Sequence, residues 1–288
     1  MQLELGVAAL VLLAALMHAG WNTLVKTGSD PLLTMVLVFG SSSLIALCAI
    51  PFVTPPLYGS WGFICLSMLL HTGYKVILLR AYRVGDLSQV YPLARGTAPL
   101  LIAVLSSLLA GEVLGAGQAA GVGVICLGVI SLTFGGGLPR RKDLPALGFA
   151  LGTGMFIASY TTVDGLGVRA AGSAAGYIAW LLFLVEIPFN LGALLMRRGK
   201  VLAYLNSQWK QGLAGGAMTL LAYGLVVWAL SRGAMAPVAA LRETGVIFAA
   251  LIGALVLGEP FGKGRVLAAV IIAGGIALLG ISSMGARI

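Results

Sequence analysis

The chain has 288 residues, of which 59% are hydrophobic and only 9% are charged. Soluble domains carry roughly 25% charged residues, so this composition excludes an ordinary soluble domain and indicates a chain solvated mainly by lipid. The formal net charge of +9 would suggest a nucleic-acid partner in a soluble protein. Here the basic residues lie in short gaps between apolar runs, where they act as signals of membrane topology.

Ten apolar runs follow one another along the chain, and a membrane-spanning helix needs about 20 mostly apolar residues. The runs cover residues 3–26, 31–52, 60–83, 86–110, 115–134, 145–167, 172–196, 210–231, 235–257 and 264–284. They are continuous rather than alternating, which disfavours the strands of a β-barrel. The gaps are too short for a soluble domain, so the sequence predicts an all-α integral membrane protein with ten transmembrane helices.

An internal repeat appears when the sequence is shifted by 147 residues on itself. The coinciding residues include Arg95 with Arg242, Thr97 with Thr244, Gly111-Glu112 with Gly258-Glu259, and Gly115, Gly117 and Gly128 with Gly262, Gly264 and Gly275. We therefore expect two five-helix repeats, residues 1–137 and 138–288, around a central cavity. Because five is odd, the two repeats have inverted topology.

The basic residues are distributed unevenly between the two sides of the predicted bundle. Twelve of the 18 fall in loops after the odd-numbered runs, namely Lys26, Arg80, Arg83, Arg140, Arg141, Lys142, Arg197, Arg198, Lys200, Lys210, Lys263 and Arg265. The opposite side has Arg169, Arg232 and Arg287. The positive-inside rule predicts that both termini lie on the non-cytoplasmic side of the cell's inner (plasma) membrane.

Ten helices, a five-plus-five inverted repeat and a GE pair closing the fourth helix of each half resemble the drug/metabolite transporter superfamily, specifically its EamA-type branch. The resemblance covers nearly the whole chain. It implies a secondary transporter that exports small metabolites, with amino acids as the leading substrate class, by alternating access. Another small polar metabolite or a drug-like compound is the alternative substrate, and an intramembrane enzyme or a channel is the alternative class.

Arg95 lies nine or ten residues into its run, near the midplane of a ~30 Å hydrocarbon core at ~1.5 Å per residue. Arg242 reaches a similar depth from the opposite side. One interpretation is a buried ion pair with Glu243 or Glu186. The other is that an arginine faces a wet cavity and binds a substrate carboxylate with its planar guanidinium. Tyr91 lies four residues before Arg95, on the same helix face.

Further polar and aromatic residues are candidates for the cavity wall. His71, Lys75 and Tyr82 project from one face of the third run, although a structural histidine and a snorkelling lysine are open alternatives. A shift of 142 residues places Asp164 on Asn22 and Tyr160 on His18. The predicted substrate-binding residues are Trp21, Asn22, His71, Lys75, Tyr82, Tyr91, Arg95, Tyr160, Asp164, Tyr223, Arg242 and Glu243.

Motifs for other chemistries do not occur in the sequence. It contains neither the G-x-x-x-x-G-K-[ST] loop of an ATP motor nor the H-E-x-x-H motif of a zinc peptidase. An intramembrane enzyme would need a nucleophile or metal at a fixed spacing from His18 or His71, and none is visible. We therefore expect no enzyme activity, no cofactor, no metal and no nucleic-acid partner. The expected partners are a small-molecule substrate and the lipid bilayer, and a monomeric state is left open.

Overall fold

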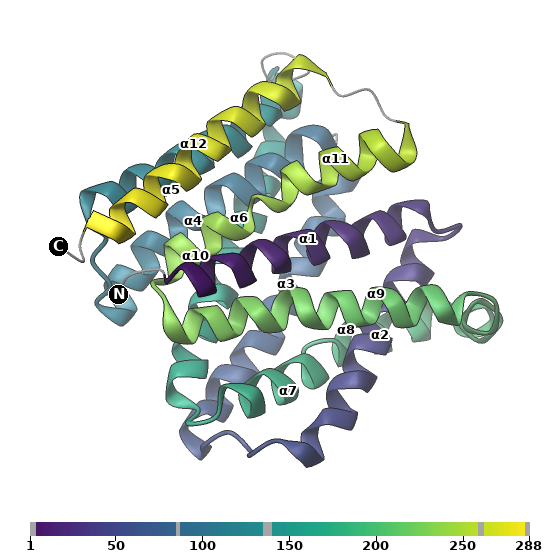
Figure 1. The fold of residues 1–288 in the computed structure, drawn as a ribbon. Coiled ribbons are helices and arrows are strands. Elements are labelled where there is room, and N and C mark those ends of the chain that lie inside the picture. Colours follow the sequence, from purple (N-terminus) through teal and green to yellow (C-terminus); the bar gives the residue numbers. More distant parts are fainter. Residues whose placement is uncertain (1–3, 85–86, 135–139, 259–261, 286–288) are drawn as a thin grey trace.

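The computed structural model describes residues 4–84, 87–134, 140–258 and 262–285 (Figure 1). These residues form helices and connecting turns, with no strand among them. The α-helices are α1 (Leu5–Thr27), α2 (Pro31–Ala49), α3 (Trp61–Val84), α4 (Leu87–Ala110), α5 (Ala116–Ser131), α6 (Leu144–Ala170), α7 (Ala174–Leu184), α8 (Ile187–Met196), α9 (Arg198–Arg232), α10 (Met235–Arg242), α11 (Gly245–Leu257) and α12 (Lys263–Gly285).

Within the described ranges, ten helical segments are long and apolar enough to cross a membrane. The predicted all-α architecture with ten transmembrane helices is thus confirmed. The clearest difference in bounds is at the eighth run, predicted to start at residue 210. There α9 starts at Arg198 and bends at Gln208, whose φ of −123° and ψ of 16° are not helical. The residues before the bend are too polar to have been recognised as part of an apolar run.

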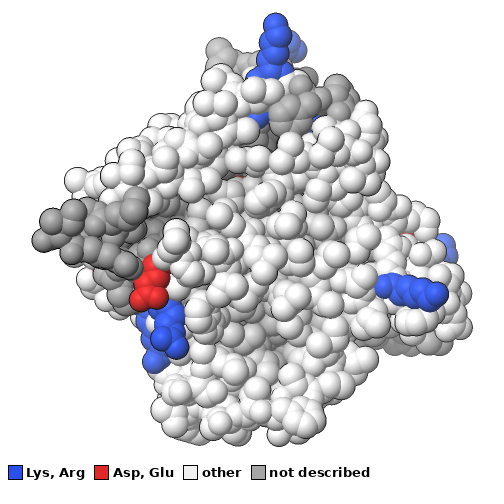
Figure 2. Space-filling view, viewed as in Figure 1, with Lys and Arg blue, Asp and Glu red and all other residues white. Residues whose placement is uncertain are grey.

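The outside of the bundle is apolar over most of its area. Figure 2 shows one face made almost entirely of uncharged residues, with charged side chains in a few separate places near its margin. Large apolar side chains such as Leu108, Leu255 and Val270 are exposed on different helices. Soluble monomers rarely expose so much contiguous apolar surface. The chain is therefore a multi-pass membrane protein.

Two of the ten spans consist of two helices each, separated by a break. In the seventh span α7 ends at Leu184, because Pro188 has no N–H to donate to the Leu184 carbonyl. In the ninth span the turn between α10 and α11 tightens, with the amide of Glu243 donating to the Ala240 carbonyl at 3.0 Å. Glu186 and Glu243 are the residues at these breaks. Broken helices at membrane depth occur where they are buried in protein or line a cavity.

The helices of the two halves contact each other in matching pairs. Helix α3 packs against α6 as α9 packs against α1, and α4 packs against α6 as α10 and α11 pack against α1. The last helices of the halves, α5 and α12, lie side by side (Figure 1). This pairing supports the predicted repeat. The predicted boundary between residues 137 and 138 lies outside the described residues.

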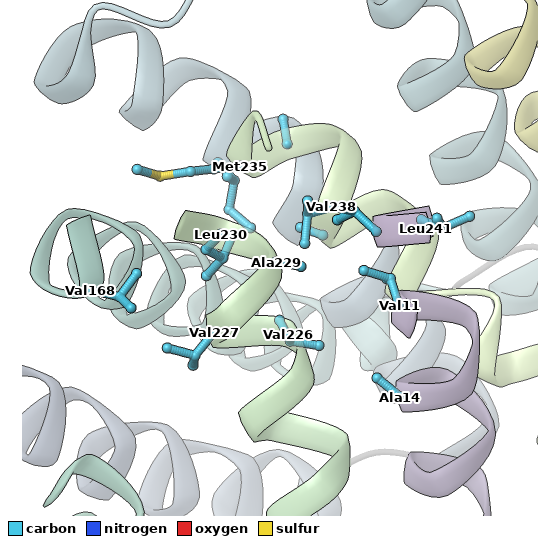
Figure 3. Packing of buried hydrophobic residues seen from close by; sticks show 14 of the residues in the cluster. Val11, Ala14, Val168, Val226, Val227, Ala229, Leu230, Met235, Val238 and Leu241 are labelled. Atoms are coloured by element: carbon cyan, nitrogen blue, oxygen red, sulfur yellow. The ribbon is translucent and has the colours of Figure 1, made fainter. Parts of the chain in front are cut away.

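The largest buried apolar cluster joins α1, α3, α4, α6, α7, α9 and α10, and Figure 3 labels members from α1, α6, α9 and α10. Its labelled members are Val11, Ala14, Val168, Val226, Val227, Ala229, Leu230, Met235, Val238 and Leu241. Each fully buried valine, leucine or methionine side chain contributes about 1.5–3 kcal/mol to folding, although lipid-embedded helices gain less because lipid is itself apolar. The cluster fixes α10 against α1 and α9, and thereby positions the break at Glu243.

Candidate functional site

Seven acidic or basic residues (Asp, Glu, Lys, Arg and His) are buried inside the spans in the described part of the chain, and they form three separate groups. None of these residues is more than 8% exposed. The groups are Arg95 with Arg242 and Glu243, Lys75 with Glu186, and His71 with Asp164. A buried charge is tolerated only when it is paired or hydrogen-bonded. The partners within each group therefore decide whether its charges are compensated.

The arginine cluster consists of two guanidinium groups around one carboxylate. The Nε atom of Arg95 lies 2.8 Å from Oε2 of Glu243, an ion-pair contact too bent to be a directed hydrogen bond. The Nη2 atom of Arg242 donates to Oε1 of the same carboxylate at 3.4 Å. With all three groups ionised, the cluster carries one excess positive charge.

The two arginines differ in how well their surroundings hold them. Nη2 of Arg95 lies 3.3 Å from Nε2 of His18, and its guanidinium carbon lies 5.7 Å from the ring centroid of Tyr91. Nε of both arginines is buried without a hydrogen-bond partner in the described part of the chain, but Arg95 approaches Glu243 more closely, at 2.8 Å against 3.4 Å for Arg242. A guanidinium has five N–H donors. The Arg242 side of the cluster is therefore short of acceptors and suited to an anionic ligand.

Lys75 and Glu186 form a self-contained ion pair between α3 and the break that separates α7 from α8. The Lys75 ammonium also lies 4.7 Å from the ring centroid of Phe39 and 5.1 Å from that of Phe189. Aromatic faces attract a cation at such distances. Lys75 therefore does not snorkel towards the membrane surface, and Glu186 pairs with Lys75 rather than with an arginine.

Asp164 accepts hydrogen bonds on both carboxylate oxygens. The Tyr177 hydroxyl donates to Oδ1 at 3.2 Å, and the Tyr223 hydroxyl donates to Oδ2. Nε2 of His71 lies 3.5 Å from Oδ2 and 3.3 Å from the Tyr223 oxygen. The imidazole ring stacks on Tyr160 with their centroids 3.8 Å apart. Asp164 is fully buried, and its oxygens are already engaged by these neighbours.

Other predicted site residues have local contacts. The Asn22 amide donates to the His18 carbonyl of its own helix at 2.7 Å. Trp21 packs edge-on against His18 and Phe39. The side chain of Tyr82 lies outside the part of the chain that the structure describes. Among the described residues, neither Asn22 nor Trp21 forms a hydrogen bond with the arginine cluster, but Trp21 packs against His18, which contacts Arg95.

Tyr177 belongs to the Asp164 group but was not predicted from the sequence. It lies in the first turn of an apolar helix, where an aromatic residue is usually an interface anchor. A Cβ atom at Gly167 would overlap the Tyr177 hydroxyl, so a glycine at 167 is what lets this tyrosine reach Asp164. The two residues lie on different helices, and no spacing in the sequence links them.

The arginine cluster is enclosed by protein. Two hollows of about 320 Å³ lie elsewhere, one lined by Thr54, Pro55, Leu57 and Ala171–Ser173 and the other mainly by apolar residues of α2, α7 and α9. Neither is lined by a residue of the three ionisable groups. Because Arg95, Arg242 and Glu243 are at most 5% exposed, access to them needs a rearrangement of the helices around them.

Comparison with known proteins places the fold. Residues 144–281 match the EamA-like transporter family. A solved structure titled "Crystal structure of protein" superposes with a TM-score of 0.76 at 17% identity, covering 98% of each chain. At this identity the likeness shows the fold alone. No curated protein matches the chain. The predicted resemblance to EamA-type transporters is confirmed.

Proposed function

We propose that the protein, a membrane transporter of small molecules whose residues 144–281 match the EamA-like transporter family, exports small metabolites that carry a carboxylate group. Amino acids are the leading class. Export proceeds by alternating access across the plasma membrane, with both termini on the non-cytoplasmic side.

The observation that carries this proposal is the imbalance of charge around Glu243. Two buried guanidiniums share one carboxylate, and an uncompensated buried charge costs several kcal/mol. A substrate carboxylate supplies the missing negative charge. Guanidinium binds a carboxylate through two parallel hydrogen bonds, which fix its orientation as well as its charge. We assign Arg242 as the main contact, because its approach to Glu243 is longer than that of Arg95, 3.4 Å against 2.8 Å, and its Nε has no hydrogen-bond partner among the described residues.

The location of the cluster supports the same proposal. Glu243 lies at the break between α10 and α11, and transporters commonly place their binding sites at discontinuous helices near the middle of the bilayer. Arg95 comes from α4 of the first half and Arg242 from α10 of the second. A substrate held by both is thus held between the two halves, where a relative movement exposes it to either side.

A polar network at one end of the bundle supports a gate. Nη2 of Arg169 lies 2.6 Å from Oε1 of Glu112 and donates to the Gly233 carbonyl at 2.8 Å. Oε2 of Glu112 accepts from the amide of Met235 at 2.8 Å. These bonds tie the ends of α4, α6, α9 and α10 together on the predicted non-cytoplasmic side. We expect this network to break in the outward-open state.

The proposal is tested by counterflow. Liposomes that contain the purified protein are loaded with a pool of unlabelled amino acids, and the entry of each labelled amino acid is measured. At least one is expected to enter faster than in protein-free liposomes and to be displaced by other carboxylate-bearing amino acids. Their carboxamide derivatives are expected to compete poorly. Entry of no amino acid would contradict the assigned class.

A further inference from the structure

Asp164 and His71 form a buried acid–base pair that takes no part in the proposed carboxylate site. We propose that this pair binds the proton that drives export, so that one proton enters the cell for each substrate molecule that leaves. The inference rests on the proposed function, because it assigns the coupling ion of that transport.

Helices α3, α6, α7 and α9 bring the pair together. His71 lies on α3 and Asp164 on α6, with Nε2 and Oδ2 3.5 Å apart. The other titratable groups that face the pair are the phenols of Tyr177 from α7, Tyr223 from α9 and Tyr160 from α6. These phenols donate hydrogen bonds or stack, but they carry no charge at neutral pH.

The charge of the pair depends on one proton. With a proton on either Asp164 or His71, the pair has no net charge. Without it, the pair has one negative charge at a buried site. An unpaired buried charge is costly, so the pair needs either the proton or a second cation close by. The arginine cluster supplies part of that compensation, because Tyr160 is within electrostatic reach of Arg95, Arg242 and Asp164. Lys75, one turn along α3 from His71, does not, since it pairs with Glu186.

Tyr160 connects the pair to the proposed substrate site. Its ring stacks on His71, and its phenol lies close enough to Arg95, Arg242 and Asp164 to interact with them electrostatically. A zwitterion whose carboxylate is held by the arginines places its ammonium group in the same enclosed region. The ammonium charge replaces the charge of the proton, so the two cations bind alternately rather than together.

The position of the pair gives the proton a route. Asp164 lies six residues before the end of α6 at Ala170, roughly 9 Å along the helix axis. Arg169, with its bridge to Glu112, closes that end. We infer that the proton binds from the outside when this bridge opens and leaves to the cytoplasm after the helices have rearranged. The only bonds made and broken are the O–H or N–H bonds to the proton.

The test is the steady-state accumulation of substrate, which reports coupling rather than rate. Liposomes carry a pH difference with the membrane potential clamped at zero, and the probe is a labelled amino acid that shows counterflow. If one proton is exchanged for each substrate molecule, the labelled amino acid accumulates on the acidic side. The concentration ratio is then about tenfold per pH unit, since one unit equals about 1.36 kcal/mol. In Asp164→Asn the ratio is expected to fall to about one while counterflow stays measurable.

Two further variants guard against misfolding. His71→Gln keeps a hydrogen-bonding side chain but cannot hold the proton, and it is expected to lower the ratio as well. Asp30→Asn removes a carboxylate that caps α2, and because asparagine caps equally well, the ratio should match the unmodified protein. Accumulation on the alkaline side, or a full ratio in Asp164→Asn, would overturn the proposal. Absence of all counterflow in the unmodified protein would instead contradict the proposed function, and this inference with it.

Discussion

Glu243 shows at the residue scale why two arginines are retained inside a membrane. Its carboxylate meets Arg95 at 2.8 Å and Arg242 at 3.4 Å. The pairing with Arg95 is one of the two interpretations that the sequence left open. The second arginine is only weakly partnered, which keeps the other interpretation, a carboxylate-binding role, as a proposal for Arg242.

Stability measurements distinguish the shared carboxylate from two independent pairs. Glu243→Gln strands both guanidiniums, whereas Arg95→Gln or Arg242→Gln leaves a balanced pair with Glu243. We expect Glu243→Gln to cost about 3–5 kcal/mol of stability and each arginine variant clearly less. Thermal unfolding of the three variants in detergent provides the comparison. An arginine variant less stable than Glu243→Gln would show that the carboxylate is not shared in this way.

The sequence predicted the buried ionisable residues better than it predicted their partners. Arg95, Lys75 and Asp164 stood out because charged residues are rare in apolar runs. Whether Glu186 or Glu243 pairs with Arg95 depends on how distant helices pack, and no local pattern contains that information. Tyr177 was missed for the same reason, since its role depends on the space that Gly167 leaves on a neighbouring helix.

At the scale of the elements, hydrophobic runs predicted ten spans but not the breaks within the seventh and ninth. A run of apolar residues looks the same whether one helix or two cross the membrane. Pro188 explains the first break. The second break, at Glu243, has no proline, and its tight hydrogen bonds form in the context of the packed bundle.

Glycines determine how closely α5 and α12 approach. A Cβ atom at Gly275 would lie 2.8 Å from the amide nitrogen of Ile125 and 3.0 Å from the Gly121 carbonyl oxygen. Both are backbone atoms that cannot move without shifting a helix. We expect Gly275→Ala to destabilise the protein by about 1–3 kcal/mol, the usual cost of overpacking.

The neighbouring Gly274 is the matched control. A Cβ there meets nothing within 4 Å, and alanine favours a helix over glycine by about 0.8–1.0 kcal/mol. Gly274→Ala is therefore expected to be neutral or stabilising. Thermal unfolding of both variants in detergent tests the difference. Equal melting temperatures would mean that α5 and α12 are not in backbone contact.

At the scale of the whole molecule, the account depends on two halves of opposite orientation. The matching helix contacts and the side-by-side α5 and α12 support a twofold relation (Figure 1). The uneven distribution of basic residues predicts which side faces the cytoplasm. The family match covers only residues 144–281. The predicted repeat is what leads us to expect the same five-helix arrangement in the first half.

A reporter fusion tests this topology. A reporter that is active only outside the cytoplasm, fused after Ile288, is expected to be active, because ten crossings return the chain to the side on which it started. A cytoplasm-only reporter at the same position serves as the control and should be inactive. The reverse pattern would overturn the predicted orientation of both halves.

The central claim is that the guanidinium pair recognises a carboxylate, and the most direct measurement is selectivity between an amino acid and its carboxamide. Counterflow should show a half-saturating concentration at least about tenfold lower for the acid, since charge-assisted hydrogen bonds contribute about 1.5–3 kcal/mol. In Arg242→Lys, which keeps the charge but loses the planar guanidinium, that preference should shrink markedly. Equal affinity for acid and amide in the unmodified protein, or an unchanged preference in Arg242→Lys, would contradict the account.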